Sequence, residues 1–271
     1  DLSVIGPLAR SAADLALALD ILAGPNDLDA AGYRLELPPP RCTQTRGARV
    51  LILDQHPEIA TAASIRTMLD RVASELEREG ALVARGSPLL PDLARGARIF
   101  AALLFAAMAP RWPKQVIDEL RAAATALPRD DDSVTGYRLR GATFSHGDWL
   151  LLDGERFQRR IAWKQLFREF DVVIAPPMPT PAFPHDHEPD FDARRIAIDG
   201  ADYPYGDMSL WAAVATEPGL PATTVPIERT ADGLPIGVQI IGPYLEDRTP
   251  LAFADLMERI FGGFVAPEAF V

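Results

Sequence analysis

The amino-acid sequence predicts an α/β fold, on three observations. A strand, a helix and a second strand follow one another between residues 48 and 86, which is the pattern of a βαβ unit. Two short β-branched apolar runs, Thr223–Ile227 and Ile236–Ile241, flank a turn that contains Asp232-Gly233, which predicts a β-hairpin. Between these units the chain carries helical apolar spacing, as in Leu93–Met108. Parallel pairing in the first unit and antiparallel pairing in the second make the predicted sheet mixed.

The first predicted element is a helix that begins after Ser11. Ser11 and Asp14 have the spacing of a capping box, and the apolar residues that follow predict a mostly buried helix that ends at Gly24-Pro25. Those apolar residues are Leu15, Leu17, Leu19, Ile21 and Leu22. Residues 25–47 are rich in proline, glycine and polar groups, which predicts a long surface connection.

The βαβ unit follows this connection. Arg49–Leu53 is a short apolar strand, Pro57 starts a helix that runs to about Glu79, and Ala81–Ala84 is the second strand. Gly80 caps the helix between them. A crossover of this kind joins parallel strands and is expected to be right-handed.

The remaining elements are predicted from the same signals. They are a helix at Lys114–Leu127, a solvated acidic loop at 130–132, a long helix from Ser145 to about Phe170, a buried strand at Asp171–Ala175, a helix near Ser209–Thr216 and a last helix from about Thr249 to Phe261. Residues 176–207 are predicted to form one long loop, dense in proline, acidic and aromatic residues. Loops of that length inside a compact domain are usually functional or mobile.

Composition excludes several classes of function. The 271 residues are 48% hydrophobic, enough for a substantial core, and the net charge of −11 argues against a nucleic-acid partner or an anionic membrane surface. The one cysteine, Cys42, excludes an internal disulfide, so we expect a reducing compartment, the cytoplasm. No apolar run approaches the roughly 18 residues that span a bilayer, and the block Ile99–Ala109 is too short.

Two segments contain residue types that suggest catalysis. Ser145, His146 and Asp148 are the members of a Ser-His-Asp triad, but residues one and three apart at a helix start cannot hydrogen-bond in series, so Ser145 is predicted to be an N-cap. Cys42 has no partner in the sequence that would activate it and is predicted to be a bystander.

The acidic segment with two histidines could hold a divalent metal, which would make the chain a metal-dependent hydrolase. It comprises His185, Asp186, His187, Glu188, Asp190 and Asp192. It lacks a helical His-x-x-x-His pair and a cysteine partner, so we expect no metal and interpret it as a loop at the mouth of a pocket. No Gly-x-Gly-x-x-Gly follows a strand and opens a helix, so no dinucleotide site is predicted and no cofactor is expected.

Three motifs carry a resemblance to a known family. They are Gly6-Pro7-Leu8-Ala9-Arg10-Ser11, Gly219-Leu220-Pro221-Ala222, and Gly233-Leu234-Pro235-Ile236-Gly237-Val238-Gln239. Together they resemble the amidase signature family, serine hydrolases of amide bonds. The resemblance covers nearly all of the chain and implies a mixed β-sheet covered by helices on both faces.

In that family a Gly/Ser-rich signature precedes the Gly-Pro-Leu-Ala-Arg-Ser segment, and here only residues 1–5 precede it. We therefore expect residues 1–271 to be the C-terminal portion of a single amidase-signature-like domain, incomplete at its N-terminal side, with the βαβ unit at about 48–86. Family members use a serine nucleophile, a second serine on a cis peptide and a neutral lysine base. The chain has no Ser-Ser pair, and neither of its two lysines, Lys114 and Lys164, suits a buried base. We expect no catalytic residue on this chain.

The resemblance also implies that this half lines the substrate pocket. Within the stretches concerned, Arg138 or Arg140 could hold a carboxylate, and Trp149, Tyr205 and Trp211 could form apolar walls. Asp207 lies in the same Tyr-Pro-Tyr-Gly-Asp loop as Tyr205. Chemistry selects these substrate-binding candidates, because no motif singles them out. The segment 215–218 (Ala-Thr-Glu-Pro) departs from the usual Asn-Leu-Ala type run before Gly-Leu-Pro.

Two functions follow as hypotheses. The first is the C-terminal part of an amidase that acts on a small-molecule amide together with its missing N-terminal part. The alternative is a non-catalytic binding or interaction module on an amidase-like scaffold. In either case a sheet without its front strands should leave an unpaired edge or an apolar face, so association with the missing part or a homo-oligomer is expected.

Overall fold

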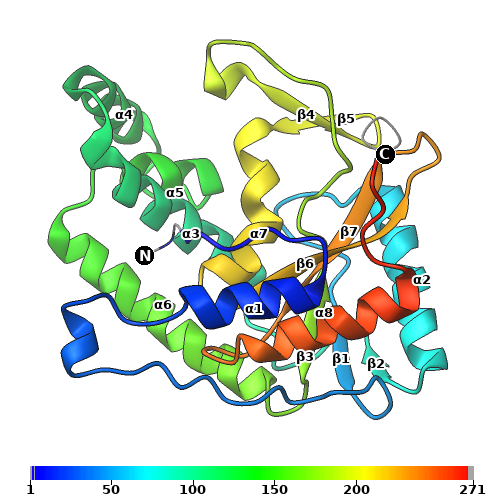
Figure 1. The fold of residues 1–271 in the computed structure, drawn as a ribbon. Helices are drawn as coiled ribbons and strands as arrows, with labels where there is room; N and C mark the ends of the chain where they lie inside the picture. The colour runs from blue at the N-terminus through cyan, green and yellow to red at the C-terminus, as the bar shows by residue number, and fades with distance from the viewer. Residues whose placement is uncertain (1, 3, 268–271) are drawn as a thin grey trace.

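The computed structural model describes residue 2 and residues 4–267 of the chain. At its centre lies a five-stranded sheet in the order β2-β1-β3-β7-β6 (Figure 1). The strands are β1 (Arg49–Ile52), β2 (Leu82–Ala84), β3 (Val172–Ala175), β6 (Ala222–Arg229) and β7 (Pro235–Ile241). β1 pairs in parallel with β2 and β3, whereas β7 pairs antiparallel with β3 and β6. The predicted mixed α/β sheet is confirmed.

Eight α-helices surround the sheet in the described residues. They are α1 (Ala12–Leu22), α2 (Ala63–Arg78), α3 (Leu93–Met108), α4 (Lys114–Ala126), α5 (Val134–Gly141), α6 (His146–Leu166), α7 (Leu210–Thr216) and α8 (Arg248–Phe261). The 3-10 turns are η1 (Asp29–Ala31), η2 (Ala109–Arg111), η3 (Phe191–Ala193) and η4 (Tyr205–Ser209). Capping confirms the prediction at α6, where Ser145 and Asp148 form a reciprocal capping box.

Helices cover both faces of the sheet. On one face, α8 packs against β6, in which Val225 and Ile227 are buried, and the Arg71 guanidinium of α2 lies 5.7 Å from the centre of the Phe261 ring at the end of α8. On the other face, the buried Gln239 amide of β7 donates to the backbone oxygen of Trp211 in α7 at 2.8 Å. The inner strands β1, β3 and β7 are consequently buried on both sides, which explains their near-continuous apolar sequences.

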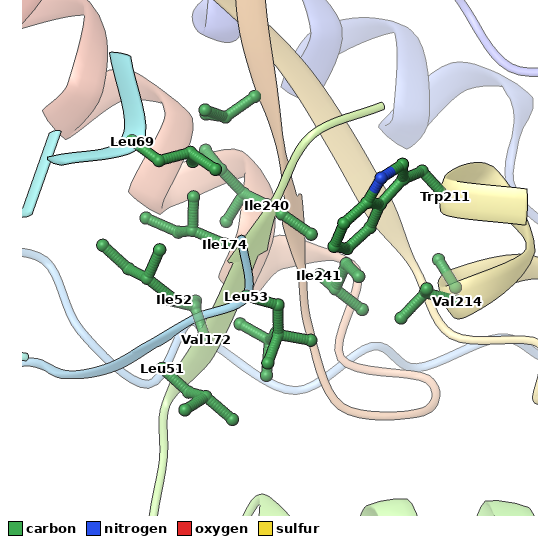
Figure 2. Packing of buried hydrophobic residues seen from close by; sticks show 14 of the residues in the cluster. Leu51, Ile52, Leu53, Leu69, Val172, Ile174, Trp211, Val214, Ile240 and Ile241 are labelled. Carbon is green, nitrogen blue, oxygen red and sulfur yellow. The ribbon is translucent and has the colours of Figure 1, made fainter. Parts of the chain in front are cut away.

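The main core lies around the inner strands. Figure 2 shows Ile52, Ile174 and Ile240 stacked across three neighbouring strands, with Leu69 of α2 beside them. Trp211 and Val214 of α7 close the core next to Ile241 (Figure 2). A smaller second core joins Leu2 to α3, α6 and α7 through Ile99, Leu103, Leu152 and Ala213.

The structure corrects two predictions about burial and boundaries. The helix after Ser11 is not mostly buried, because Ala12 is its only buried residue, and Ser11 caps it through Asp14 N without a reciprocal bond. The helix predicted from Pro57 begins at Ala63, where the Asp199 carboxylate accepts from Ala63 N at 2.9 Å. A side chain from a distant loop therefore sets this boundary.

One α-helix and two strands were not predicted from the sequence. The short helix α5 occupies the segment between the acidic run and Ser145. The long 176–207 loop contains a two-stranded hairpin, β4 (Arg195–Ile198) and β5 (Ala201–Pro204), which projects beyond the main sheet (Figure 1). Asp199 and Gly200 at its turn both have positive φ, of 50° and 84°, as a tight hairpin requires.

One helical stretch is long and apolar enough to cross a bilayer, contrary to the expectation from the sequence. Leu93–Arg111 has 19 residues with a mean hydropathy of 1.4, so it is long and apolar enough to cross a bilayer by length and composition. Half of the stretch is buried inside the fold, where α3 contacts α5, α6 and α7. A core helix has the same apolar character, and its packing supplies a sufficient reason for it.

Candidate functional site

Arg138 and Asp207 lie against each other although 69 residues separate them in the chain. Arg138 Nη2 donates to Asp207 Oδ1 at 3.2 Å, and the two side chains are only 11% and 15% exposed. The Arg138 guanidinium also lies over the ring of Phe105, 5.4 Å from its centroid. Both residues were candidates for substrate binding, and the structure brings them together at the junction of α5 and η4.

Close backbone packing places Arg138 at this junction. Ser133 caps α5 by accepting from Gly136 N at 2.9 Å. Gly141, at the end of α5, touches the backbone of α3 so closely that a Cβ there would lie 2.2 Å from the oxygen of Ala102. At the other side of the pair, a Cβ on Gly206 would lie 2.9 Å from the Arg138 guanidinium nitrogens. Glycines therefore allow the approach on both sides of Arg138.

The electrostatics of this pair reflect its burial. Burial raises the pKa of Asp207 above its ordinary value, although the neighbouring Arg138 guanidinium opposes this effect. Arginine presents five N–H donors in a planar fork that matches a carboxylate. Asp207 accepts only one hydrogen bond from this fork, so it does not engage the guanidinium bidentately.

Tyr205 connects the pair to an aromatic cluster. Its ring meets Phe183 edge-on at 6.0 Å and Phe191 edge-on at 5.6 Å. The Arg194 guanidinium lies over both Tyr205 and Phe191, 5.9 Å from each ring centre. These edge-to-face contacts are the favoured geometry for aromatic pairs and fix the loop that carries Asp207.

Phe183 also lines a cleft of about 690 Å³. The cleft lies between the 180–187 loop, the β4–β5 hairpin and the 230–234 turn, and its volume is within the range of small-molecule sites. Its polar lining comprises Ser64, Thr180, His185, Asp186, His187, Arg195, Asp202, Thr230 and Asp232. The predicted interpretation of the His185 segment as a pocket-mouth loop agrees with this position.

Trp149 lies at a second hollow. It follows the capping box of α6, stacks on the His146 ring at 6.4 Å, and lines a groove of about 390 Å³. Ala106, Ile117 and Phe144 belong to the apolar lining of this groove. The indole therefore belongs to a wall made by α3, α4 and the start of α6.

Arg140 and Trp211 take other positions. Arg140 is directed to the loop before α5, where Nη2 donates to the oxygen of Pro128 at 3.3 Å and lies 3.9 Å from Asp131 Oδ1. Trp211 is fully buried, and its Nε1 donates to Thr61 Oγ1 at 3.2 Å. Of the six substrate-binding candidates, the structure thus groups Arg138, Tyr205 and Asp207.

A buried polar cluster around Glu217 was not predicted from the sequence. Glu217 is 2% exposed and accepts from Arg159 Nε at 2.9 Å. His56 and Trp163 lie with this pair around a water-sized cavity of about 10 Å³, and the Trp163 Nε1 atom is buried without a partner. Burial lowers the pKa of His56 to about 4, so its imidazole is neutral near pH 7. The only sequence signal was the departure at 215–218 from the usual family run.

The raised pKa of Glu217 predicts that the free energy of unfolding depends on pH. Burial raises its pKa to about 6 from an ordinary 4.5, despite Arg159. The folded state therefore binds a proton more tightly than the unfolded state, so this contribution is complete below pH 4.5 and is lost as the pH rises through 6. The difference is about 2 kcal/mol. Relative to a Glu217→Gln variant, the unfolding free energy of the wild type should fall by that amount between pH 4.5 and 7 in urea titrations. A difference that stays constant over this range would contradict the shift.

Other candidate reactive groups show no catalytic setting. Burial raises the pKa of the Cys42 thiol to about 11, which disfavours the reactive thiolate. Lys114 has a side chain that is 88% exposed and pairs with Asp118, and Lys164 lies exposed on α6. Within residue 2 and residues 4–267, no three His, Cys, Asp or Glu side chains gather in a group that could hold a metal ion.

Comparison with known families gives one extensive match. The model of the Amidase family matches residues 1–251. The chain is 28% identical to a glutamyl-tRNA(Gln) amidotransferase subunit of Thermus thermophilus, over 95% of this chain and 56% of the relative. It is 27% identical to the indoleacetamide hydrolase of Bradyrhizobium japonicum, over 95% of this chain and 52% of that protein. The chain spans about half the length of these relatives.

Solved structures show the same fold. A bacterial aryl acylamidase of the amidase signature family superposes with a TM-score of 0.66 at 20% identity, covering 94% of this chain and 52% of that one. The 6-aminohexanoate cyclic dimer hydrolase gives a TM-score of 0.64 at 19% identity, with coverages of 93% and 54%. Both superpositions again involve about half of the longer protein.

Proposed function

Because this chain belongs to the amidase family, we propose that it is the C-terminal, substrate-pocket-forming part of an enzyme that hydrolyses carbon–nitrogen amide bonds. The sequence resemblance to the amidase signature family is confirmed by the family match. In this proposal residues 1–271 form the C-terminal portion of a single domain. The enzyme acts in the cytoplasm, in keeping with a single cysteine that has no disulfide partner in the chain.

The observation that carries the pocket assignment is the buried Arg138–Asp207 pair. It joins two segments from distant parts of the chain and adjoins the aromatic cluster at Tyr205. A substrate with a carboxylate or another anionic group would bind the Arg138 fork, and the aromatic cluster would hold its apolar part. The proposed substrate class is therefore a small-molecule amide with an anionic group.

The bond-cleaving machinery lies, in this proposal, on polypeptide outside this chain. A serine nucleophile needs an adjacent base, and a neutral lysine base needs burial. Neither lysine of the chain offers it, since one is 88% exposed and the other is on the exposed face of α6. Residues of this chain would orient the amide, so that a correctly placed carbonyl meets the nucleophile and the oxyanion donors.

The pocket assignment is tested by a pair of amide substrates, one with a carboxylate and one without, offered to the complete product of the gene. Arg138→Gln should lower kcat/KM for the carboxylate substrate by about 10- to 100-fold, the value of a charge-assisted hydrogen bond. The neutral amide should change by less than about threefold.

Arg140→Gln is the matched control, because Arg140 is directed to the loop before α5. It should leave both rates near the wild-type values. Circular dichroism establishes that each variant is folded. Equal losses for both substrates in the Arg138 variant would show that this residue acts on structure and does not select the substrate.

A further inference from the structure

Helix α1 exposes a face of large apolar side chains. Its sequence is almost wholly apolar, yet only Ala12 is buried, and Leu17, Ile21 and Leu22 are 61%, 73% and 70% exposed. The helix rests on α8 through one side only, where Ala12 N donates to the Glu258 carboxylate at 2.7 Å. Large apolar side chains gathered on one exposed face are typical of an interaction surface.

The segment before α1 repeats this feature. Val4, Ile5 and Leu8 are 83%, 101% and 100% exposed. The segment is held at both ends, because Leu2 is buried in the second core and Ala12 is buried against the main one. Figure 1 shows this blue stretch running across the front of the molecule into α1. Its apolar side chains therefore occupy a fixed course over the surface.

A third apolar surface lies on α6. Leu150, Phe157 and Ile161 follow one another at helical spacing and are 52%, 54% and 39% exposed. Gly154 lies in the same stripe, and a Cβ there would meet no atom within 4 Å. The opposite side of α6 is packed, with Leu152, Trp163 and Leu166 buried. The exposed stripe is therefore apolar, like the side of α6 that packs in the core.

The share of the relatives that this chain covers identifies the occupant. The matches include 95% to 98% of this chain but only 52% to 57% of the amidase and amidotransferase relatives concerned. Permanent interfaces between polypeptides are large and apolar, and they resemble a domain core cut in half. We propose that the exposed apolar faces of residues 4–8, α1 and α6 form one binding surface. Its partner is the amidase polypeptide that corresponds to the half of these relatives that this chain does not cover. This inference rests on the proposed function.

Hydrogen exchange tests this assignment. Amide exchange in α1 and in residues 150–161 is measured in the 271-residue chain and in the complete product of the gene. The expected result is exchange at least tenfold slower in the complete product. In that product the double variant Leu17→Asp with Ile21→Asp should lose the protection of α1. Val116→Asp is the control, since Val116 is 36% exposed on α4, away from the three faces, and it should leave the protection unchanged.

Several results would overturn the proposal. They are equal exchange in both proteins, a complete gene product with no residues beyond these 271, and protection of the same amides by a second copy of this chain in light-scattering dimers. Circular dichroism of the double variant in the 271-residue chain establishes that the exposed substitutions leave the fold intact. Amide turnover by the complete product is recorded in parallel. If the complete product hydrolyses amides but the α1 amides are not protected, only the docking surface is contradicted. If the α1 amides are protected but no amide is hydrolysed, only the proposed function is contradicted.

Discussion

Replacing Trp211 with alanine should lower the free energy of unfolding by about 3–5 kcal/mol, the usual cost of removing a fully buried large aromatic side chain. Trp211 is 0% exposed, packs with His56 edge-on at 5.4 Å, and donates its indole N–H to Thr61. Truncation removes the packing and leaves a cavity between α7 and the sheet (Figure 2). Urea unfolding of the 271-residue chain, followed by circular dichroism, measures the loss.

Trp149→Ala is the matched control for this experiment. Trp149 is only partly buried and lines a surface groove, so its removal should cost less than about 2 kcal/mol. Similar losses for the two variants would mean that Trp211 is not the core residue that the structure describes. Trp211 would then return as a candidate for a pocket wall.

Gly141→Ala should destabilise the chain by about 3 kcal/mol, at the upper end of the range for overpacking. The added Cβ would lie 2.2 Å from the oxygen and 2.6 Å from the Cα of Ala102, and both are backbone atoms. Backbone cannot rotate away as a flexible side chain can, so α5 has to move away from α3. That movement displaces Arg138, and the expected companion effect is weaker binding of an anionic substrate by the complete enzyme.

Gly154→Ala provides the opposite result within the same chain. Gly154 lies inside α6, and a Cβ there would meet nothing within 4 Å. Alanine has the higher helix propensity, so this variant should gain up to about 1 kcal/mol in the 271-residue chain. Urea unfolding of the two variants side by side is the measurement. A Gly141→Ala variant as stable as Gly154→Ala would refute the close contact of α5 with α3.

The sheet could be predicted from the sequence because its strands carry strong local signals. The β6–β7 hairpin follows from two β-branched runs around Asp232-Gly233, and the parallel β1–β2 pair follows from strand, helix and strand in sequence. Helix α5 could not be predicted, because two glycines and two arginines in eight residues give no apolar stripe. Its stability comes from the Ser133 cap and from packing against α3, which are not visible in a local pattern.

The β4–β5 hairpin did carry a signal that the proline-rich surroundings hid. Arg195–Ile198 has isoleucine at alternate positions, both of them buried, and Asp199-Gly200 is a favoured hairpin turn. For α1 the sequence predicted the helix but not its exposure. Its apolar sequence correctly indicates a packing element, but the surface that would cover it is not formed by the described residues.

The candidate site was predictable in its residue types and not in its pairing. Arg138 and Asp207 were each selected for chemistry, but only the fold shows that they meet across 69 positions. Glu217 escaped selection because its meaning depends on burial and on Arg159, 58 residues away on another helix. Such long-range ion pairs leave no periodic trace in a sequence.

The most direct test of the proposed division of labour is an activity measurement on the 271-residue chain alone. The purified chain is incubated with amide substrates and, separately, with a fluorophosphonate probe that labels activated serines. We expect neither turnover nor stoichiometric labelling, because the proposal assigns the pocket to this chain and the nucleophile to other polypeptide. Amide hydrolysis that co-elutes with the pure 271-residue chain, with one serine labelled per chain, would contradict it.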